Sequence, residues 1–593
     1  MKVLMVGINA KYIHSNLAIR SLHKYAATFG FSVLVEEYTI NQSVDYVLRE
    51  IVKLAPDLIG FSCYIWNIEM IKKLTRALKQ ISPQTRILLG GPEVSYDGEN
   101  LLKEEPSIDF VCYGEGEETF KNILEALHKD TSFESIDGLI FRNPQIVKNQ
   151  SRAPLSMDAL PFVYHNSLCD FEHRILYYET IRGCPFNCQY CLSSIEKGVR
   201  FRSISLVKRE LQFFLDQKVK QVKFVDRTFN CSKKHAMAIW TYLAEQDNGV
   251  TNFHFEISAD LLDLEMLIFL KTVRIGLFQF EIGVQSTSDK TLESIQRKTN
   301  FEALVNNVMS LKAGDNIHLH LDLIAGLPHE DYQTFKKSFN DVYALRPEQL
   351  QLGFLKVLKG SGLLEDCEAY GIKYRTYAPY EVLCTKDLTF LELEKLKTIE
   401  EMVEFYYNSG QYEWTMLYLE RQFETPFDLY EALATEWELK GHHKVSHSRG
   451  DLMVFLKEFS ELIKGAKVDL VRELILFDLC LLEKIKKYPP WMDGQEAGRN
   501  ESNGFYKDPK NIAQYLPQLT LYSPKQISRM AHIEGFLYDL TRFVTTKGEV
   551  IDKKSVWLLF NYHNRDQMRH KAQVFEVQMD PIISAEISLF PRK

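Results

Sequence analysis

Two series of short apolar segments, separated by helical patterns, constrain the fold of this chain more than any other feature of its sequence. In the first series, over residues 1–128, the apolar runs are nearly continuous, as expected for parallel strands that are buried on both faces. The expected strands are residues 2–7, 31–38, 57–64, 85–92 and 108–114. Helical patterns fill the gaps, so we expect a doubly wound, flavodoxin- or Rossmann-like α/β domain with a parallel sheet over residues 1–130.

A second series of strand-like segments begins near Ile175. Six segments recur at spacings of roughly 25 to 45 residues, with helical patterns between them, as in parallel β/α units. They read ILYYETIRG, VKQVKFVD, FHFEIS, FQFEIGV, HLHLDLIAG and LQLGFLKV. Because a closed TIM barrel has eight strands, residues 171–370 are predicted to form an open, partial (β/α)6 TIM-like barrel.

The segments on either side of this barrel have different patterns. Residues 131–170 contain a predicted hairpin around Asn143-Pro144, followed by a linker with Pro154 and Pro161. Beyond Gly371 the sequence changes to helical patterns rich in Leu, Glu, Lys and Tyr. Residues 371–593 are therefore predicted to form a mainly α-helical C-terminal region, with short strands at 555–561 and 574–577.

The composition argues against several classes of protein. The net charge of −8 is made of interspersed acidic and basic residues, so no nucleic-acid partner is expected. The apolar run at the N-terminus is too short for a signal peptide, and no uncharged apolar stretch approaches 18 residues, so no membrane association is expected. The ten cysteines are scattered except for one group of three, which favours a cytoplasmic protein with mostly reduced thiols.

The group of three cysteines carries the strongest chemical signal. The segment RGCPFNCQYC, directly after the first expected barrel strand, contains Cys184, Cys188 and Cys191 in C-x3-C-x2-C order. This position is the C-terminal mouth of the barrel, where barrel enzymes build their sites. Three thiolates on one loop can bind three corners of a [4Fe–4S] cluster, which leaves the fourth iron without a protein ligand.

A structural zinc site is the main alternative for these cysteines. Structural zinc takes four ligands, typically as two close pairs, and the chain has no second C-x2-C. The pair His443 and His447 lies about 250 residues downstream, beyond the usual span of a zinc module. Asp451 would share a helical face with these histidines, but the glycine- and serine-containing sequence around them favours a solvated loop over a metal site.

The cysteine loop resembles the signature of the radical S-adenosylmethionine (SAM) superfamily. In that family the amino and carboxylate groups of SAM chelate the open iron, and one-electron reduction cleaves SAM to methionine and a 5′-deoxyadenosyl radical that abstracts a hydrogen atom. The resemblance places Tyr190 near the adenine and extends to polar or turn residues at later strand ends, which could reach the ribose and methionine of SAM. These expected SAM contacts are Asp226, Glu256, Ser258, Glu281, Gln285, Asp322 and Gly326.

Glycines at the ends of two expected sheet strands suggest a ligand in the first domain. Ligands of open α/β sheets bind beyond the carboxyl ends of the strands, and glycines there permit close approach, although they also serve tight turns. A G-x-G-x-x-G loop does not follow the first strand, which disfavours a dinucleotide. Together with the domain order, the segments GGPE, GEGE and IGFSCY resemble the cobalamin (B12)-binding branch of the radical SAM superfamily over roughly residues 1–360. The resemblance implies cobalamin contacts by Ser62, Tyr64, Gly90, Gly91, Glu93, Gly114 and Gly116.

One departure from other cobalamin domains concerns the cobalt ligand. The loop Asp-x-His-x-x-Gly, which supplies a histidine to cobalt in many such domains, is absent. We therefore expect cobalamin without histidine on cobalt, and we interpret His14 as an ordinary residue at the start of a helix. Residues 371–593 resemble an extension of uncharacterised role on some members of this branch.

The resemblance implies a cobalamin-dependent radical SAM enzyme, most often a methyltransferase that acts on an unactivated carbon. A non-methylating cyclase or rearrangement enzyme remains an alternative within this class. A methylthiotransferase-like enzyme would carry three cysteines in the first domain, where this chain has Cys63 and Cys112. A non-catalytic iron–sulfur or cobalamin sensor is the third alternative. The expected partners are a small-molecule or peptide substrate and an external one-electron reductant such as flavodoxin or ferredoxin; no catalytic residue is assigned.

Overall fold

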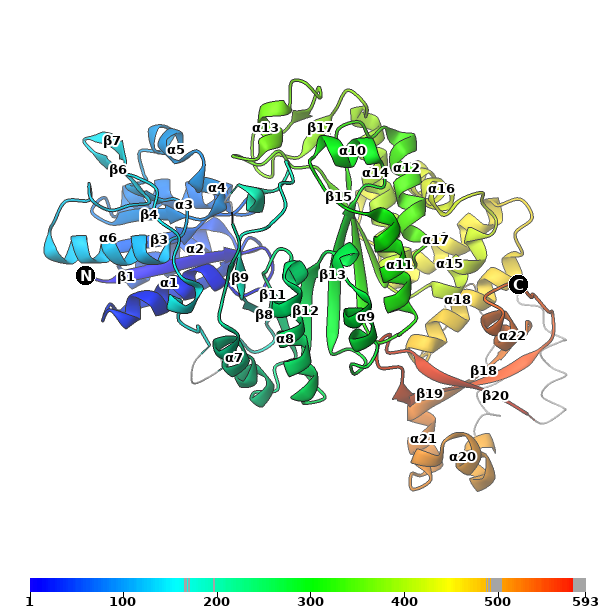
Figure 1. Ribbon diagram of the computed structural model, residues 1–593. Helices are drawn as coiled ribbons and strands as arrows, with labels where there is room; N and C mark the ends of the chain where they lie inside the picture. Colours follow the sequence, from blue (N-terminus) through cyan, green and yellow to red (C-terminus); the bar gives the residue numbers. More distant parts are fainter. Residues whose placement is uncertain are drawn as a thin grey trace. The chain divides into compact units, whose positions relative to one another are not determined.

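The computed structural model of the 593-residue chain describes residues 1–164, 168, 171–195, 198–486, 488, 491 and 504–579. The expected linker within 131–170 and the C-terminal tail therefore lie partly outside the described residues. The chain forms two compact units (Figure 1). The first comprises residues 1–335 and 353–390, and the second comprises residues 336–352 and 391–593.

The N-terminal part of the first unit is built on a seven-stranded sheet of order β2-β1-β3-β4-β5-β6-β7. Its first five strands are parallel to their neighbours, and a hairpin of β6 and β7 continues the sheet antiparallel to β5. The order 2-1-3-4-5 is that of flavodoxin-like folds, so the predicted doubly wound architecture is confirmed. The strands are β1 (Val3–Asn9), β2 (Val33–Thr39), β3 (Leu58–Ser62), β4 (Arg86–Gly90), β5 (Phe110–Cys112), β6 (Leu139–Asn143) and β7 (Gln145–Lys148).

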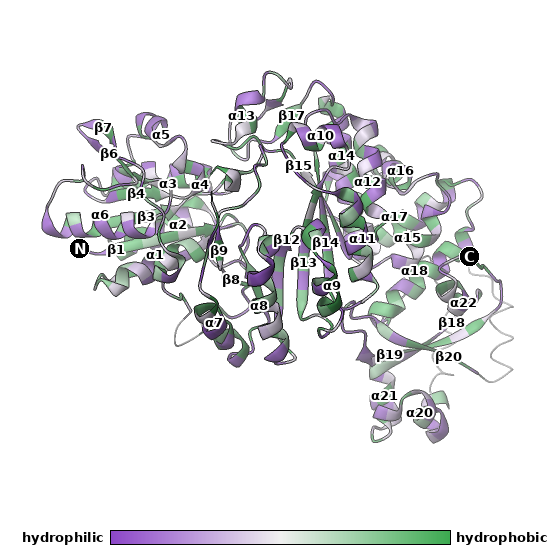
Figure 2. Cartoon of the chain, in the orientation of Figure 1, coloured by the Kyte–Doolittle hydropathy of each residue, from purple (hydrophilic) through white to green (hydrophobic). Residues whose placement is uncertain are grey.

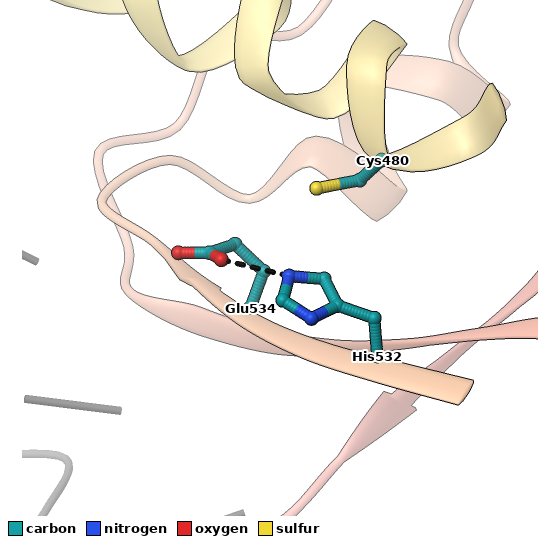
Figure 3. Close-up of side chains that lie close together, drawn as sticks. All are labelled: Cys480, His532 and Glu534. Carbon is teal, nitrogen blue, oxygen red and sulfur yellow. Dashed lines mark hydrogen bonds and ion pairs between the residues drawn. The ribbon is translucent and has the colours of Figure 1, made fainter. Parts of the chain in front are cut away.

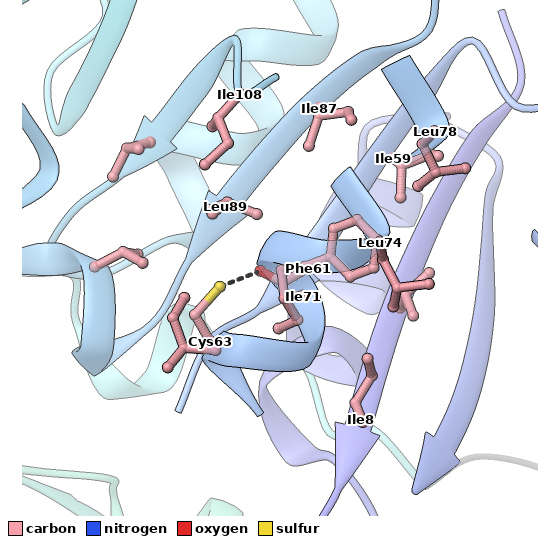
Figure 4. Close-up of a cluster of buried hydrophobic side chains, with 14 of the residues drawn as sticks. Ile8, Ile59, Phe61, Cys63, Ile71, Leu74, Leu78, Ile87, Leu89 and Ile108 are labelled. Atoms are coloured by element: carbon pink, nitrogen blue, oxygen red, sulfur yellow. Dashed lines mark hydrogen bonds between the residues drawn. The ribbon is translucent and has the colours of Figure 1, made fainter. Parts of the chain in front are cut away.

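Helices cover both faces of this sheet because its strands carry apolar side chains on both sides. Alternate residues of a strand point to opposite faces: Leu4 packs in one core cluster, whereas Met5 packs in the other. The first cluster includes α2 (Val44–Leu54) and α3 (Ile68–Ile81), and Figure 4 shows part of it. The second includes residues of α1 (Leu17–Thr28) and α6 (Glu117–Lys129), and Figure 2 shows hydropathy alternating along α6. Each large buried side chain contributes roughly 1.5–3 kcal/mol of transfer free energy.

The second sheet is the expected partial barrel, with six strands in the order β15-β14-β13-β12-β11-β8. The pairings between β8 and β14 are all parallel. Helices such as α7 (Ile204–Asp216), α8 (Lys233–Glu245) and α11 (Phe301–Lys312) connect the strands. The strands are β8 (Leu176–Tyr178), β11 (Gln221–Phe224), β12 (Asn252–Ile257), β13 (Phe278–Gln285), β14 (His318–Ala325) and β15 (Gln349–Phe354).

Strand β13 shows how this sheet separates its apolar side from its polar side. Its burial alternates strictly: Phe278, Phe280 and Ile282 are buried, and the residues between them are half-buried. Phe278 and Phe280 pack against Trp240 of α8, with ring centroids 6.3 and 5.5 Å apart. Because successive side chains alternate between faces, Glu281 and Gln285 lie on the face opposite to this aromatic layer.

The second unit is mainly helical, as predicted, and ends in a small antiparallel sheet. This sheet has the order β18-β19-β20, with β18 (Ala531–Phe536), β19 (Val556–Arg565) and β20 (Ala572–Val577). β19 overlaps the segment expected at 555–561 and β20 contains the one expected at 574–577, whereas β18 was not predicted. No helix among the described residues is long and apolar enough to cross a membrane. The main helices are α14 (Phe390–Val403), α15 (Glu413–Glu420), α16 (Pro426–Leu439), α17 (Arg449–Leu462) and α18 (Val468–Leu482).

Candidate cofactor-binding site

The three clustered cysteines lie on one loop at the mouth of the partial barrel. The loop follows β9 (Ile181–Arg182) and is closed by β10 (Arg200–Phe201), which pairs antiparallel with β9. Gly183 begins it with a φ of +89°, a conformation that favours glycine. Cys184, Cys188 and Cys191 are free thiols, and Cys188 is the buried one. Reduced thiols on one loop fit three corners of an iron–sulfur cluster.

Backbone hydrogen bonds hold the middle of this loop in place. The N–H of Gln189 donates to the carbonyl of Ile295 at 2.9 Å, and its carbonyl accepts from the N–H of Leu363 at 2.9 Å. The hydroxyl of Thr228, at the end of the second barrel strand, lies 3.6 Å from the Sγ of Cys184. Neighbouring loops of the barrel mouth therefore preorganise the thiols.

Arg297 is the charged residue that the structure brings to this loop. Its Nη1 lies 3.8 Å from the Sγ of Cys188 and 3.3 Å from the hydroxyl of Tyr190, and its Nη2 donates to the carbonyl of Gly283 at 2.5 Å. Burial raises the pKa of the Cys188 thiol, and the charge of Arg297 opposes that rise. Sequence reasoning missed Arg297 because it follows a short helix and has no fixed spacing from the cysteines.

Asp226 positions the start of the cysteine loop from the end of β11. Its buried carboxylate accepts hydrogen bonds from the N–H groups of Thr180 (2.8 Å) and Ile181 (2.9 Å) and from the Thr180 hydroxyl (2.5 Å). Burial raises the pKa of Asp226 to about 7, although these hydrogen bonds oppose the rise. Both oxygens of Asp226, a predicted SAM contact, are therefore already hydrogen-bonded within the chain.

The polar face of the barrel sheet carries a network of charged side chains. Glu281 lies 2.8 Å from the Nζ of Lys223 and 3.1 Å from the Nε2 of His254. Although burial raises its pKa, these two neighbours lower the pKa of Glu281 overall. On the next strand the Nε2 of His320 lies 2.9 Å from the Oδ1 of Asp322.

Three further predicted SAM contacts occupy distinct environments at the strand ends. Burial raises the pKa of Glu256 to about 7, and Arg227 lies 4.0 Å away. The Oγ of Ser258 donates to Asp260 at 2.6 Å. The buried Oε1 of Gln285 has no hydrogen-bond partner among the described residues, so it is available to a ligand.

Gly326 adopts a φ of +88°, and a Cβ atom there would lie 2.8 Å from the Cγ1 of Val382. The turn therefore requires glycine for its shape.

A cavity of about 650 Å³ lies in the first unit, between the carboxyl edge of the N-terminal sheet and the partial barrel. One end of it is a slot bounded by Met5, Gly60 and Leu88 of the sheet and by helix residues such as Leu22 and Phe120. At the barrel side it reaches Tyr177, Glu179, Arg182 and Arg227. The predicted cobalamin contacts that line it are Ser62, Tyr64, Gly90, Gly91, Gly114 and Gly116.

Glu93, the seventh predicted cobalamin contact, does not line this cavity. It is buried and accepts a hydrogen bond from the hydroxyl of Tyr380, and the Nζ of Lys359 lies 3.6 Å away. Burial raises its pKa, and these two partners oppose the rise. Glu93 thus ties the sheet edge to the segment that follows β15.

Comparisons with known proteins agree with this arrangement. Family models match residues 3–124 (B12 binding domain), 178–342 (Radical SAM superfamily) and 368–560 (Protein of unknown function, DUF4080). The chain thus carries a B12-binding domain followed by a radical SAM domain. The DUF4080 match covers most of the C-terminal extension.

Relatives of this radical SAM protein include two methyltransferases by name. An uncharacterised methyltransferase of Pyrococcus horikoshii is 26% identical over 380 residues, which cover 61% of this chain and 81% of that protein. The cobalamin-dependent radical SAM methyltransferase TokK of Streptomyces tokunonensis is 25% identical over 352 residues. That alignment covers 54% of this chain and 50% of TokK, so this chain spans about half the length of TokK.

Two solved structures with a similar fold were determined with cobalamin bound. The methyltransferase TsrM of Kitasatospora setae, solved with cobalamin and a [4Fe–4S] cluster, has a TM-score of 0.53 at 16% identity, covering 64% of this chain and 76% of TsrM. The radical enzyme OxsB, solved with aqua-cobalamin and SAM, has a TM-score of 0.53 at 14% identity, covering 80% and 78% of the two chains.

Within this radical SAM protein, ion pairs join the B12-binding domain to the cysteine loop. Arg182, two residues before Cys184, lies 2.6 Å from Glu117 and 3.0 Å from Glu179. Arg200, on the paired strand β10, forms an ion pair with Glu115. These contacts connect the N-terminus of α6 with both ends of the cysteine loop, and local sequence patterns do not reveal them.

His14 also lines the cavity, near the start of α1. Its Nδ1 lies 2.6 Å from the hydroxyl of Tyr177 on β8. Burial and nearby lysines lower its pKa, which keeps the imidazole neutral. Two residues further on, Asn16 caps α1 by accepting from the N–H of Ile19, and its side-chain nitrogen donates to the Oγ of Ser62 at 2.8 Å.

Proposed function

We propose that this chain is a cobalamin-dependent radical SAM methyltransferase that acts on an unactivated carbon. The observation that carries the proposal is the cavity that the B12-binding domain and the barrel mouth share, with Arg182 joining it to the cysteine loop. When bound, the cofactors supply reductive cleavage of SAM to a 5′-deoxyadenosyl radical and a transferable methyl group.

The chain itself binds and positions these groups. Cys184, Cys188 and Cys191 hold the cluster, and the strand-end residues beside them hold SAM. The slot lined by Met5, Gly60 and Leu88 takes the nucleotide tail of cobalamin, and any side chain at position 60 would collide with Met5 on its wall. The corrinoid would bind without histidine on cobalt, because the sequence lacks the Asp-x-His-x-x-Gly loop and the Nδ1 of His14 already bonds to Tyr177. The proposed SAM contacts are Tyr190, Glu256, Ser258, Glu281, Gln285 and Asp322. The other two residues expected there, Asp226 and Gly326, orient the cysteine loop and shape a turn.

We also propose an electron donor, a class of substrate and a cellular location for this chain. An external one-electron donor of the flavodoxin or ferredoxin type reduces the cluster, and the substrate is a small molecule or peptide. Such chemistry with reduced thiols suits the cytoplasm. A methylthiotransferase is less well supported, because it would carry three cysteines in the first domain, whereas residues 1–128 contain Cys63 and Cys112, both buried.

Anaerobic purification followed by cluster reconstitution tests the proposal. We expect about four irons and one corrinoid per chain, and 5′-deoxyadenosine or S-adenosylhomocysteine on addition of SAM and a strong reductant. Incubation with methyl-labelled SAM should then produce labelled methylcobalamin. A protein that binds corrinoid but never accepts the label would favour a cyclase or a sensor, and about eight irons per chain would favour sulfur insertion.

A further inference from the structure

A cysteine, a histidine and a glutamate meet inside the second unit, far along the chain from the cysteine loop. Cys480 lies near the end of α18, and His532 and Glu534 lie on β18 (Figure 3). One ligand atom of each residue lies within 4.8 Å of those of the other two. The three residues are 0%, 9% and 5% exposed. They belong to the region that matches DUF4080.

Local structure explains why these side chains converge. Residues two apart on a strand point to the same face, so His532 and Glu534 both rise from β18 toward the side occupied by Cys480. The Nε2 of His532 lies 2.9 Å from the Oε2 of Glu534 (Figure 3). The hydroxyl of Tyr562 on β19 donates to the backbone carbonyl of Cys480 at 2.8 Å, which fixes the end of α18 over the sheet.

The chemistry of this group differs from that of an ordinary core. A buried carboxylate is costly unless its charge is compensated, and the ion-pair partner that the structure gives Glu534 is an imidazole. The hydroxyl of Tyr488 donates to the same carboxylate at 2.5 Å, much as hydrogen bonds orient carboxylates that bind metals. Thiolate, imidazole and carboxylate are together the ligands that zinc takes in proteins.

Full burial of the thiol also distinguishes a metal site from a nucleophilic one. Reactive cysteines lie in partly exposed, electropositive surroundings, whereas Cys480 is fully buried. A divalent ion would neutralise the Cys480 thiolate and the Glu534 carboxylate together. Zinc binds sulfur at about 2.3 Å and nitrogen or oxygen at about 2.0–2.2 Å, so the three atoms need to close only slightly around an ion.

We propose that Cys480, His532 and Glu534 bind one zinc-class divalent transition-metal ion, which joins α18 to β18 in the C-terminal domain. Three protein ligands leave the fourth tetrahedral position to water or to a polar group of the domain. Binding displaces the thiol proton of Cys480. Asp451, which the sequence placed beside His443 and His447, has other partners: it accepts hydrogen bonds from the N–H and hydroxyl of Ser448, both at 2.8 Å.

The test uses the full chain with the three loop cysteines replaced (C184A/C188A/C191A), so that cluster iron does not mask a second metal. After growth with zinc and dialysis, mass spectrometry of the metals should find about one zinc per chain. The variants C480S, H532Q and E534Q should each reduce zinc affinity at least tenfold. C63S is the matched control, because Cys63 is equally buried but directly follows β3 in the first unit, and it should keep the zinc.

Cobalt(II) titration keeps the test valid if a variant folds poorly. With the three site residues intact, the cobalt-loaded chain should show an intense thiolate-to-cobalt charge-transfer absorption in the near ultraviolet, and C480S should lack it. Two results would overturn the proposal. One is less than about a tenth of a metal ion per intact chain together with no thiolate–cobalt band. The other is unchanged metal content in C480S, H532Q and E534Q proteins whose circular dichroism is that of the parent.

Discussion

The guanidinium of Arg182 lies 2.6 Å from the carboxylate of Glu117, and this pair joins the two halves of the cofactor site. Glu117 begins α6 of the B12-binding domain, where the helix dipole favours a negative charge. Arg182 ends the strand that leads into the cysteine loop. A charge on the corrinoid-binding side thus fixes the position of the loop that carries the cluster ligands.

Replacing Arg182 should therefore damage both stability and cofactor binding. In R182M the buried Glu117 and the half-buried Glu179 lose their common cation, and breaking a buried pair costs about 3–5 kcal/mol. We expect a lower free energy of unfolding in denaturant titration and less corrinoid retained on gel filtration. K53M is the control, because the exposed Lys53 pairs with Glu50 on α2 and its loss should cost no more than about 1 kcal/mol. Equal effects of the two substitutions would contradict this role.

Gly91 should be intolerant of any side chain. Its φ of +112° belongs to a region that is almost restricted to glycine, and a Cβ atom would lie 2.6 Å from the backbone carbonyl oxygen of Cys63. G91A should lower the free energy of unfolding by more than about 2 kcal/mol and weaken cobalamin binding. Gly30 also has a positive φ, +85°, but a Cβ there meets nothing within 4 Å. G30A should lower the free energy of unfolding by only about 1 kcal/mol and leave cobalamin binding intact. Similar cobalamin affinities in G91A and G30A would argue against the slot as the cobalamin site.

Much of this architecture could be predicted because it depends on local patterns. The apolar strand Leu58–Ser62 and the thiol spacing from Cys184 are both visible within a few residues of sequence. Strand β18 was missed because His532 and Glu534 interrupt its apolar pattern. They face Cys480 of α18, about fifty residues away in the chain, and no local pattern reveals that neighbour.

The same reasoning explains the unexpected surroundings of the predicted site residues. Glu93 follows a glycine-rich strand end, as a cofactor contact would, but Tyr380 lies 287 residues further along the chain and binds its carboxylate. Asp226 was expected to face SAM, but its Oδ1 accepts from the N–H groups of Thr180 and Ile181 and its Oδ2 accepts from the Thr180 hydroxyl. Local sequence indicates that a polar group lies at a strand end, whereas its partner depends on the tertiary fold.

Arg297 should be required for an intact cluster loop. R297Q removes the cation beside Cys188 and the donor to the Gly283 carbonyl, and an unpaired buried acceptor costs about 1–3 kcal/mol. We expect reconstituted R297Q protein to hold fewer irons per chain and to lose its cluster absorption faster in air. R297K retains the charge and should recover part of the iron content. Wild-type iron content and oxygen sensitivity in R297Q would exclude this role.

Asp226 should make the stability of the first unit depend on pH. Its pKa is raised from 3.8 to about 7 by burial, so the folded protein holds a proton that the unfolded chain releases more easily. The stabilisation is present below pH 3.8 and is lost as pH rises toward 7 and above. In D226N an amide oxygen can still accept from the N–H groups of Thr180 and Ile181. The amide nitrogen can donate to the Thr180 hydroxyl, which can turn toward His235 at 3.1 Å.

The free energy of unfolding of D226N minus that of the parent should therefore be about 1–3 kcal/mol larger at pH 8 than at pH 5. D226A, which leaves the backbone N–H groups of the loop without an acceptor, should be less stable at both pH values and should retain less iron. Denaturant titrations at the two pH values measure the effect. If D226N and the parent show the same change in stability between pH 5 and pH 8, the buried carboxyl is ionised throughout and the raised pKa is wrong.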